Sequence, residues 1–342
     1  MKAMLLKKVG ILAKGESRLE LAHIPEPAPD EGELLIRISA CGVCHTELDE
    51  IEGRTPPPFL PVVPGHQIVG RVEKCGSKTG AFKAGNRVGV GWIYSACGEC
   101  RFCREGNDNL CHAFKATGRD ANGGYANYVT VPESSAYPIP GIFSDAEAAP
   151  LLCAGAIGYR SLRLTGLMDG QSLGLTGFGA SAHLVLKMAR HRFPNSAVYV
   201  FARSEKERAF ARELGAVWAG HTEDKAPQPL NCIIDTTPVW KPIVEALSNL
   251  EAGGRLVINA IRKEEVDKDY LLKLDYSKHL WMEKEIKSVA NVSRSDVSEF
   301  MQLAAEMGLK PEVQEFPLED ANKALAELKA GKIRGAKVLR ME

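Results

Sequence analysis

A cluster of four cysteines constrains the fold of this chain more than any other feature. Cys97, Cys100, Cys103 and Cys111 are separated by two, two and seven residues. Four thiolates in one short lobe can surround a tetrahedral Zn²⁺, and such a site holds together a lobe that has little apolar material of its own. Because protein fills all four positions and leaves none for a substrate, the spacing predicts a structural zinc rather than four unconnected thiols.

An iron–sulfur cluster is the rival interpretation, since its motif also begins with cysteines separated by two residues. That motif has its fourth cysteine after three further residues and before a proline. In this chain Cys111 comes after seven residues and precedes His112. The spacing therefore favours zinc.

Composition narrows the class of protein and of partner. With 342 residues the chain predicts two domains. Nine cysteines, an odd number at low density, argue against a disulfide framework and for a reducing compartment, so we expect a cytoplasmic protein. Lys plus Arg and Asp plus Glu both number 43, and no segment forms a basic face, which argues against nucleic acid or a membrane surface as partner. No apolar run is long enough to predict a signal peptide or a membrane span.

The first 150 residues or so are rich in Gly and Pro and contain short β-prone runs bounded by turn residues. This pattern predicts an antiparallel, barrel-like β domain. The runs are Glu33–Ser39, Ile68–Val72, Arg87–Val90 and Tyr125–Val131.

The pattern becomes helical at Ser144–Leu164, and strands then alternate with helices of about ten residues, which predicts a doubly wound parallel sheet with helices on both faces. The predicted strands are Ser172–Thr176, Ala197–Ala202, Val217–Ala219, Asn231–Asp235 and Arg255–Ala260, the last opened by a turn at Gly253 and Gly254; the helices are Ala182–Arg190, Glu205–Leu214 and Pro242–Leu250. The charged segment Ile261–Lys284 is expected to be a solvated excursion. Amphipathic helices are predicted over Val297–Met307 and Leu318–Lys329.

A second set of metal-ligating residues is spread along the sequence. Cys44 lies in a Cys-Gly-Val-Cys-His-Thr string, His66 in Pro-Gly-His, and Cys153 at the start of the first helical stretch. Two Cys and one His give Zn²⁺ three protein ligands and leave one position for water or substrate, the pattern of a catalytic zinc. Each residue taken alone is more often a buried Cys or a hydrogen-bonded His, so the prediction depends on the three together.

A glycine turn follows the strand predicted at Ser172–Thr176. Gly177, Gly179 and Ala182 match the fingerprint in which a tight turn and a helix N-terminus approach a pyrophosphate, with Ala in place of the third Gly. About 20 residues later, where an acid would bind the ribose of NAD(H), the chain has Arg203 and Ser204. A guanidinium and a hydroxyl offer a 2′-phosphate hydrogen bonds, so NADP(H) is the expected cofactor and NAD(H) the alternative. Lys206 and Arg208 either help to bind this phosphate or are solvated.

Together these motifs and their order resemble the medium-chain, zinc-dependent alcohol dehydrogenases, in particular the cinnamyl-alcohol-dehydrogenase-like branch. The resemblance spans nearly the whole chain. It implies a GroES-like β-barrel catalytic domain, residues 1–152 and 290–342 with a structural zinc lobe at 95–113, and a Rossmann dinucleotide-binding domain, residues 153–289. It also implies that the catalytic zinc is held by Cys44, His66 and Cys153.

The resemblance implies further roles in hydride transfer between NADP(H) and a primary or aromatic alcohol or aldehyde, by way of a zinc-bound alkoxide. Thr46 matches the hydroxyl that carries the alcohol proton toward the cofactor ribose, and His45 matches a position that touches the pyrophosphate. Trp92 resembles an aromatic residue of the substrate pocket, although a place in the barrel core is the alternative. Homodimers and homotetramers are both expected of such a family.

Three positions depart from the family pattern. Gln67 replaces the Glu that often follows the zinc-ligand His, which removes a negative charge near the metal. Asp49 stands where many relatives have a His, so the proton leaves through water or through this carboxylate. Ala336 follows Gly335 where an Arg often meets the pyrophosphate, and the neighbouring Arg334 is the expected substitute.

The sequence thus favours a zinc- and NADP(H)-dependent alcohol dehydrogenase or aldehyde reductase. The alternatives are an NAD(H)-linked dehydrogenase of another small alcohol and, from another class, a non-catalytic nucleotide-binding protein stabilised by zinc. The intact set of Cys44, His66 and Cys153 argues against the second alternative, because a scaffold has no use for an open metal site.

Overall fold

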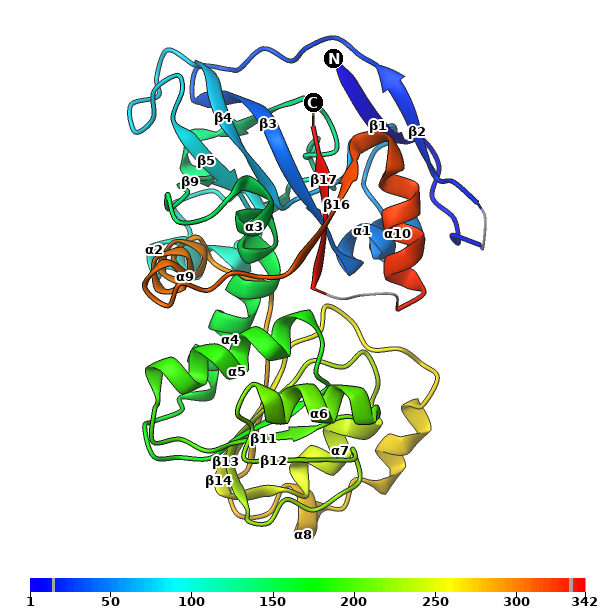
Figure 1. Cartoon of the computed structure of the whole chain (residues 1–342), viewed down its shortest axis with the longest axis vertical. Coiled ribbons are helices and arrows are strands. Elements are labelled where there is room, and N and C mark those ends of the chain that lie inside the picture. The colour runs from blue at the N-terminus through cyan, green and yellow to red at the C-terminus, as the bar shows by residue number, and fades with distance from the viewer. Residues whose placement is uncertain (14–15, 332–334, 342) are drawn as a thin grey trace. The chain divides into compact units, whose positions relative to one another are not determined.

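A computed structural model describes residues 1–13, 16–331 and 335–341 (Figure 1). The described chain divides into two compact units: unit 1 comprises Met1–Cys153 and Val292–Glu342, and unit 2 comprises Ala154–Asn291. Cys153 is the last residue of the first segment of unit 1, one residue beyond the boundary expected from the sequence. No helix among the described residues is long and apolar enough to cross a membrane.

Unit 1 is built around a largely antiparallel sheet of order β16-β17-β3-β4-β5-β9, with β8 paired to the outer part of β3. This confirms the predicted antiparallel β domain. Its elements are β1 (Lys2–Leu6), β2 (Leu19–His23), β3 (Glu33–Val43), α1 (His45–Ile51), β4 (Ile68–Cys75), β5 (Arg87–Val90), β6 (Ile93–Ser95), α2 (Arg101–Arg104), β7 (Lys115–Ala116), β8 (Tyr128–Pro132), β9 (Ala136–Pro138), α3 (Asp145–Pro150), α9 (Arg294–Glu306), β16 (Val313–Pro317), α10 (Ala321–Lys329) and β17 (Ala336–Arg340).

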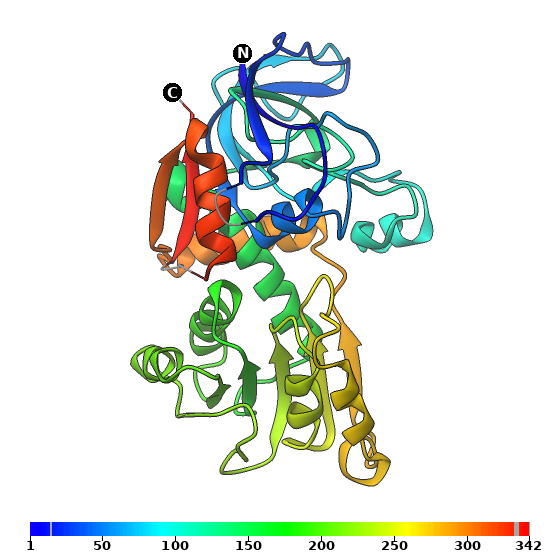
Figure 2. The same ribbon diagram turned by 90° about the vertical axis from the view of Figure 1, so that its right-hand side faces the viewer.

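The C-terminal segment completes this sheet. β17 pairs antiparallel with the end of β3, with Lys337 opposite Val43 and Arg340 opposite Ala40. Figure 2 shows β17 and α10 side by side in red. The segment therefore supports the end of β3, directly before Cys44.

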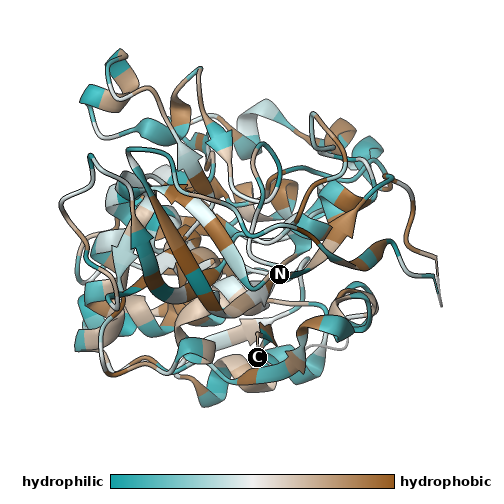
Figure 3. Cartoon of the chain, turned by 90° about the horizontal axis from the view of Figure 1, so that it is seen from above, coloured by the Kyte–Doolittle hydropathy of each residue, from teal (hydrophilic) through white to brown (hydrophobic). Residues whose placement is uncertain are grey.

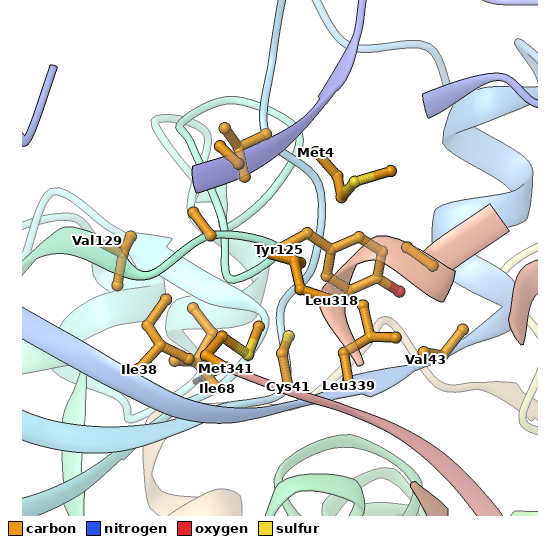
Figure 4. Packing of buried hydrophobic residues seen from close by; sticks show 14 of the residues in the cluster. Met4, Ile38, Cys41, Val43, Ile68, Tyr125, Val129, Leu318, Leu339 and Met341 are labelled. Carbon is orange, nitrogen blue, oxygen red and sulfur yellow. The ribbon is translucent and has the colours of Figure 1, made fainter. Parts of the chain in front are cut away.

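The sequence predicts a strand that starts at Tyr125. In the structure Tyr125 instead lies in the core of unit 1, before the strand. The strand begins only at Tyr128, because the backbone of Tyr125 bonds elsewhere: its N–H donates to Pro64 O and its carbonyl accepts from Met4 N. Figure 4 shows its ring among Met4, Cys41, Leu318 and Leu339. In β8, the buried Val129 and Val131 alternate with partly exposed residues, as half-buried strands require, and Figure 3 shows the hydropathy of each residue on the ribbon.

Unit 2 contains a parallel sheet of order β12-β11-β10-β13-β14-β15 with helices on both faces (Figure 2), which confirms the predicted doubly wound sheet. Its elements are α4 (Ala156–Thr165), β10 (Leu173–Thr176), α5 (Ala180–Arg192), β11 (Val198–Phe201), α6 (Glu205–Glu213), β12 (Trp218–Gly220), β13 (Leu230–Asp235), α7 (Lys241–Leu247), β14 (Leu250–Ile258), α8 (Tyr276–His279) and β15 (Glu285–Ser288). The order reverses at β10, the strand that ends directly before Gly177.

Two predictions for unit 2 were wrong in detail. Gly253 and Gly254 do not form a turn before a strand but lie within β14, which already begins at Leu250. The positive φ of Gly253, +70°, lets the strand pass through an irregularity there, opposite a register shift in β13. Within the charged segment Ile261–Lys284, the side chains of Lys263 and His279 are buried rather than solvated.

Candidate active site and metal centres

Cys44, His66 and Cys153 meet inside unit 1. Their ligand atoms all lie within 4.8 Å of one another. The Cys44 and Cys153 sulfurs are 4.0 Å apart, and His66 Nε2 is 3.3 Å from the Cys153 sulfur. A tetrahedron with Zn–S bonds of about 2.3 Å has an edge of about 3.8 Å. The three donors therefore have the spacing and the chemistry of a zinc site with one open position.

Three different local structures bring these ligands together. Cys44 lies between the end of β3 and the start of α1. His66 follows Gly65, whose φ is +101°; a Cβ there would lie 2.4 Å from the Tyr125 ring, so only glycine fits the turn. Cys153 lies in a π-helical turn, Leu151–Gly155, between α3 and α4. Such turns are frequent at functional sites because they re-aim side chains.

Glu47 is a functional candidate that sequence reasoning missed. Its Oε1 lies 2.5 Å from His66 Nδ1, and its Oε2 accepts a hydrogen bond from the Cys44 backbone N–H at 2.7 Å. Both side chains are fully buried. A carboxylate on Nδ1 fixes the ring so that Nε2 faces the metal. The available signal was its position, three residues after Cys44 at the start of a helix, but nothing in the sequence linked it to His66.

The charges of this group depend on one another when no metal is bound. Burial lowers the pKa of His66, but the Glu47 carboxylate and the Cys44 sulfur together outweigh it, and the pKa stays well above its usual value. The hydrogen bond between the thiols lowers the pKa of Cys44 and raises that of Cys153. Zinc needs thiolates and a neutral imidazole, so binding would displace protons from these ligands.

The other predicted catalytic residues lie on α1. The Thr46 hydroxyl is 3.6 Å from the Cys44 sulfur, so it is beside the ligand set. His45 is exposed at the start of the helix. Asp49 is buried and accepts a hydrogen bond from Arg54 Nε at 2.5 Å. Asp49 is therefore an ion-pair partner of Arg54, and its role in proton transfer stays a prediction.

Trp92 and Gln67 are buried next to His66. The Trp92 ring is 4% exposed and meets the His66 ring edge-on, with centroids 5.0 Å apart. Arg119 lies over the Trp92 ring at 5.7 Å. The Gln67 side chain covers Gly42 of β3, where an added Cβ would lie 2.3 Å from its Oε1.

The four clustered cysteines also converge. Cys97 Sγ lies 3.5 Å from Cys111 Sγ and 3.9 Å from Cys103 Sγ, and the Cys100 and Cys103 sulfurs are 3.6 Å apart. These distances match the edge of the same zinc–sulfur tetrahedron. Backbone N–H groups of Cys100 and Glu99 lower the pKa of Cys97 to about 6, which favours a thiolate. The four sulfurs therefore suit a closed, structural metal centre.

The predicted dinucleotide residues lie at the carboxyl end of β10. Gly177 has a φ of +76° and its N–H donates to Phe201 O, which ties the turn to β11. A Cβ on Gly177 would lie 2.9 Å from Thr237, whereas a Cβ on Gly179 would meet nothing within 4 Å. The Gly179 backbone is thus open to a ligand at the start of α5. Ala182 is fully buried in this helix.

Arg203 and Ser204 are exposed between β11 and α6, whereas Arg208 is buried and points inward. The Ser204 side chain makes no capping hydrogen bond to α6, although it occupies the position where serine usually makes one. Arg208 is therefore not a phosphate ligand of the kind envisaged from the sequence. Arg334 lies outside the described residues.

Comparisons with known proteins agree with this architecture. The family model "Alcohol dehydrogenase GroES-like domain" matches residues 30–141. The probable alcohol dehydrogenase AdhA of Mycobacterium tuberculosis (strain CDC 1551 / Oshkosh) is 40% identical over 344 residues, which cover 99% of this chain and 97% of that protein. An alcohol dehydrogenase of Geobacillus stearothermophilus is 31% identical, covering 98% of this chain and 99% of the relative.

Solved structures show the same fold. A crystal structure of an NAD-dependent alcohol dehydrogenase matches with a TM-score of 0.89 at 25% identity and covers 100% of both chains. A cinnamyl alcohol dehydrogenase of Sorghum bicolor matches with a TM-score of 0.83 at 25% identity, covering 99% of this chain and 97% of the other. The chain belongs to the medium-chain, zinc-type alcohol dehydrogenase family.

Proposed function

We propose that this alcohol dehydrogenase uses two zinc ions per chain and prefers NADP(H), and that it interconverts primary or aromatic alcohols and their aldehydes. The observation that carries the proposal is the convergence of Cys44, His66 and Cys153. Their ligand atoms have the separations of a tetrahedral zinc site, with one ligand position left for the substrate oxygen. A zinc-stabilised scaffold without activity would have no use for this open position. Cys97, Cys100, Cys103 and Cys111 would hold the second, structural ion.

The bound groups supply the reactive chemistry: zinc acts as a Lewis acid on the substrate oxygen, and the nicotinamide carries the hydride. The chain's own residues orient the zinc ligands and balance the charge at the site of hydride transfer. Glu47 orients His66 and keeps its Nε2 toward the ligand set. The two thiolates of Cys44 and Cys153 balance the charge of the dication, so the site stays close to neutral inside a buried environment.

Thr46 is the residue best placed to take the alcohol proton. Its hydroxyl lies beside the Cys44 sulfur at the start of α1, and a hydroxyl can accept one proton while it donates another. From there the proton would leave through water or through Asp49. Since the Asp49 carboxylate is already engaged by Arg54, the water route is favoured. His45, exposed beside it, would touch the cofactor pyrophosphate.

The preference for NADP(H) rests on the residues that follow β11. Arg203 and Ser204 are exposed, and no carboxylate stands at the position where an acid would bind a ribose lacking the phosphate. Gly177, Gly179 and Ala182 would hold the pyrophosphate, with Arg334 as a further contact. NAD(H) is the second candidate, because one solved structure with the same fold is an NAD-dependent enzyme.

The substrate class rests on Trp92. A large aromatic ring next to His66 favours flat or unbranched substrates over bulky polyols. The likeness to the sorghum cinnamyl alcohol dehydrogenase supports a place in that branch. A homodimer or homotetramer remains the expected assembly.

A panel of alcohols and aldehydes assayed with NADP(H) and NAD(H) tests the proposal. We expect a higher kcat/KM with NADPH than with NADH, highest values for primary and aromatic substrates, and about two zinc ions per chain by metal analysis. Cys44→Ala should lose one zinc and the activity, while Cys97→Ala should lose the other. Full activity of Cys44→Ala would overturn the catalytic assignment, and a clear preference for NADH would overturn the cofactor assignment. One zinc ion per chain in the wild type would favour the alternative of a non-catalytic protein stabilised by zinc.

A further inference from the structure

Arg208 of α6 is turned toward the loop that carries the predicted phosphate-binding residues. Its side chain is buried, and its Nη1 donates hydrogen bonds to the carbonyl oxygens of Ala202 at 2.7 Å and of Arg203 at 2.9 Å. These two carbonyls belong to the backbone between β11 and α6. One guanidinium therefore fixes the piece of chain from which the side chains of Arg203 and Ser204 extend.

The same guanidinium also binds the carboxylate of Glu205. Arg208 Nη2 and Nε donate to Glu205 Oε2 at 2.6 and 3.0 Å, and Arg212 Nη1 lies 3.1 Å from Glu205 Oε1. Glu205 follows Ser204 directly, so a free carboxylate there would repel a phosphate bound by Ser204. Its two oxygens are instead each engaged by an arginine.

The opposite end of this loop is anchored as well. Ala202 N–H donates to Gly220 O of β12 at 3.0 Å, and the neighbouring Phe201 carbonyl accepts from Gly177 N–H. The backbone at residues 201–203 is thus bonded on both sides, to the glycine turn and to Arg208. The Ser204 hydroxyl, which caps no backbone group of α6, is left available to a ligand.

We propose that Arg208 is a positioning residue for cofactor specificity: it holds the 202–204 backbone and the Glu205 carboxylate so that the 2′-phosphate of NADP(H) meets Arg203 and the Ser204 hydroxyl. This inference rests on the proposed preference for NADP(H). Arg208 does not touch the cofactor in this scheme. Its loss should weaken binding of ligands that carry the 2′-phosphate and spare those that lack it.

Equilibrium binding tests the inference without recourse to turnover. Dissociation constants are measured by calorimetry for NADPH and NADH, and for adenosine 2′,5′-bisphosphate and AMP, with the zinc-loaded protein. For Arg208→Met we expect the Kd of NADPH and of the bisphosphate to rise about tenfold. This is the effect of losing one well-formed charged contact between the 2′-phosphate and the displaced Arg203 or Ser204. The Kd of NADH and AMP should change less than about twofold.

Two further variants separate positioning from a general structural role. Arg212→Met removes the other arginine from Glu205 but makes no bond to the carbonyls of Ala202 or Arg203; it should leave the ratio of the two cofactor Kd values within about twofold of the wild type. Arg208→Lys keeps the charge without the planar fork. It should give an intermediate loss confined to the ligands that carry the 2′-phosphate, and it serves as the test if Arg208→Met does not fold.

The outcomes distinguish this inference from the proposed function. If the wild type binds NADH more tightly than NADPH, the cofactor assignment fails and the role of Arg208 falls with it. If the wild type prefers NADPH but the Arg208 variants weaken all four ligands equally, or none, the cofactor assignment stands and the role of Arg208 is overturned. A selective loss for NADPH and the bisphosphate supports both.

Discussion

Glu47 shows how much of this site depends on a residue that touches no metal. It joins the backbone of Cys44 to the ring of His66, two ligands that come from different parts of the chain. Removing a carboxylate of this kind typically weakens metal binding 10- to 100-fold. We therefore predict that Glu47→Ala weakens zinc at the Cys44 site by about this factor, as measured by competition with a chromophoric chelator.

Glu47→Gln is the matched variant, because an amide oxygen can still accept the hydrogen bond from His66 Nδ1. It should retain most of the affinity. The zinc of the four-cysteine lobe should be unaffected in both variants, since Cys97 and its partners lie elsewhere in the sequence and make no bond to Glu47. Loss of both zinc ions together would contradict this role of Glu47.

The residues of the candidate zinc site could be predicted from the sequence, whereas the residues that support them could not. Cys44, His66 and Cys153 belong to residue types with a strong chemical signature, and their neighbouring motifs gave each one a context. Glu47 is an ordinary acid in a helix, and its value depends on the tertiary fold that brings His66 to it. The same holds for Arg208: its side chain could have been solvated, and only the structure shows that it bonds backbone carbonyls.

At the level of elements, α1 is tied to α10 and to the N-terminal segment through Glu52. The Glu52 carboxylate pairs with Lys329 at the end of α10, with Arg54, and with the backbone N–H of Leu12. Partial burial opposes the shift, but hydrogen bonds from Lys329 and Arg54 lower the pKa of Glu52 to about 2. This contact therefore stabilises the position of the helix that begins with His45 and Thr46.

Because the pKa of Glu52 is lower in the folded than in the unfolded chain, its stabilisation is complete above the unfolded value of about 4.3 and is lost as the pH falls toward 2. We predict that Glu52→Gln lowers the free energy of unfolding by about 1–2 kcal/mol at pH 7, a value reduced for the exposure of Lys329 and Arg54. Urea denaturation of both proteins at pH 7, 5, 4 and 3.5 should show the difference shrinking below about pH 4.5. A difference that stays constant to pH 3.5 would contradict this origin.

Lys263 links the carboxyl ends of two strands in unit 2. Its Nζ lies 2.5 Å from Asp235 Oδ2 at the end of β13 and donates to Thr237 O at 2.6 Å, while the Thr176 hydroxyl of β10 donates to the other oxygen of Asp235. The side chains of Lys263 and Asp235 are 8% and 0% exposed. Lys263→Met leaves a buried carboxylate without its cation, which costs about 3–5 kcal/mol. Urea denaturation should show this loss.

The double variant Lys263→Met with Asp235→Asn separates the ion pair from the packing. An amide can still accept from the Thr176 hydroxyl and carries no charge, so it should recover part of the lost stability relative to Lys263→Met alone. A Lys263→Met protein as stable as the wild type would mean that the ion pair between Lys263 and Asp235 does not stabilise this edge of the sheet. Surface lysines such as Lys268, which pairs with Glu265 at the surface, serve as controls and should change stability by less than about 0.5 kcal/mol.

The strands were predicted correctly where the hydrophobic pattern of the local sequence agrees with the tertiary fold. β5 spans the predicted residues, β10 and β13 differ from their predicted ranges by one residue at the start, and β11 differs by one residue at each end, because runs of buried apolar residues leave few alternatives. β14 was cut short in the prediction because glycines usually mark turns, but a glycine with a positive φ can also lie inside an irregular strand. Lys263 was expected to be solvated because a charge in a charged segment usually is, and the buried Asp235 that receives it lies 28 residues away in the sequence.

At the level of the whole molecule, the proposed metal sites and the proposed cofactor site lie in different units. Among the described residues, both groups with metal-ligand spacing lie in unit 1, whereas Gly177, Gly179 and Arg203 lie in unit 2. Each unit has a hydrophobic core of its own, one around Tyr125 and one around Leu256. Each core can therefore respond separately to the ligand bound by its own unit.

Hydrogen exchange followed by mass spectrometry measures the two responses by region. Removing zinc with a chelator should increase exchange in peptides from residues 96–112 and 44–66, because these segments lose the ligand that holds them. Peptides from the strands of unit 2 should be unchanged. Adding NADPH at 100 times its Kd stabilises the unit that binds it by about 2.7 kcal/mol, so exchange should slow around residues 173–204 and not in the four-cysteine lobe. Equal changes in both units after chelation would show instead that zinc supports the fold of the whole chain, and that the two cores do not respond independently.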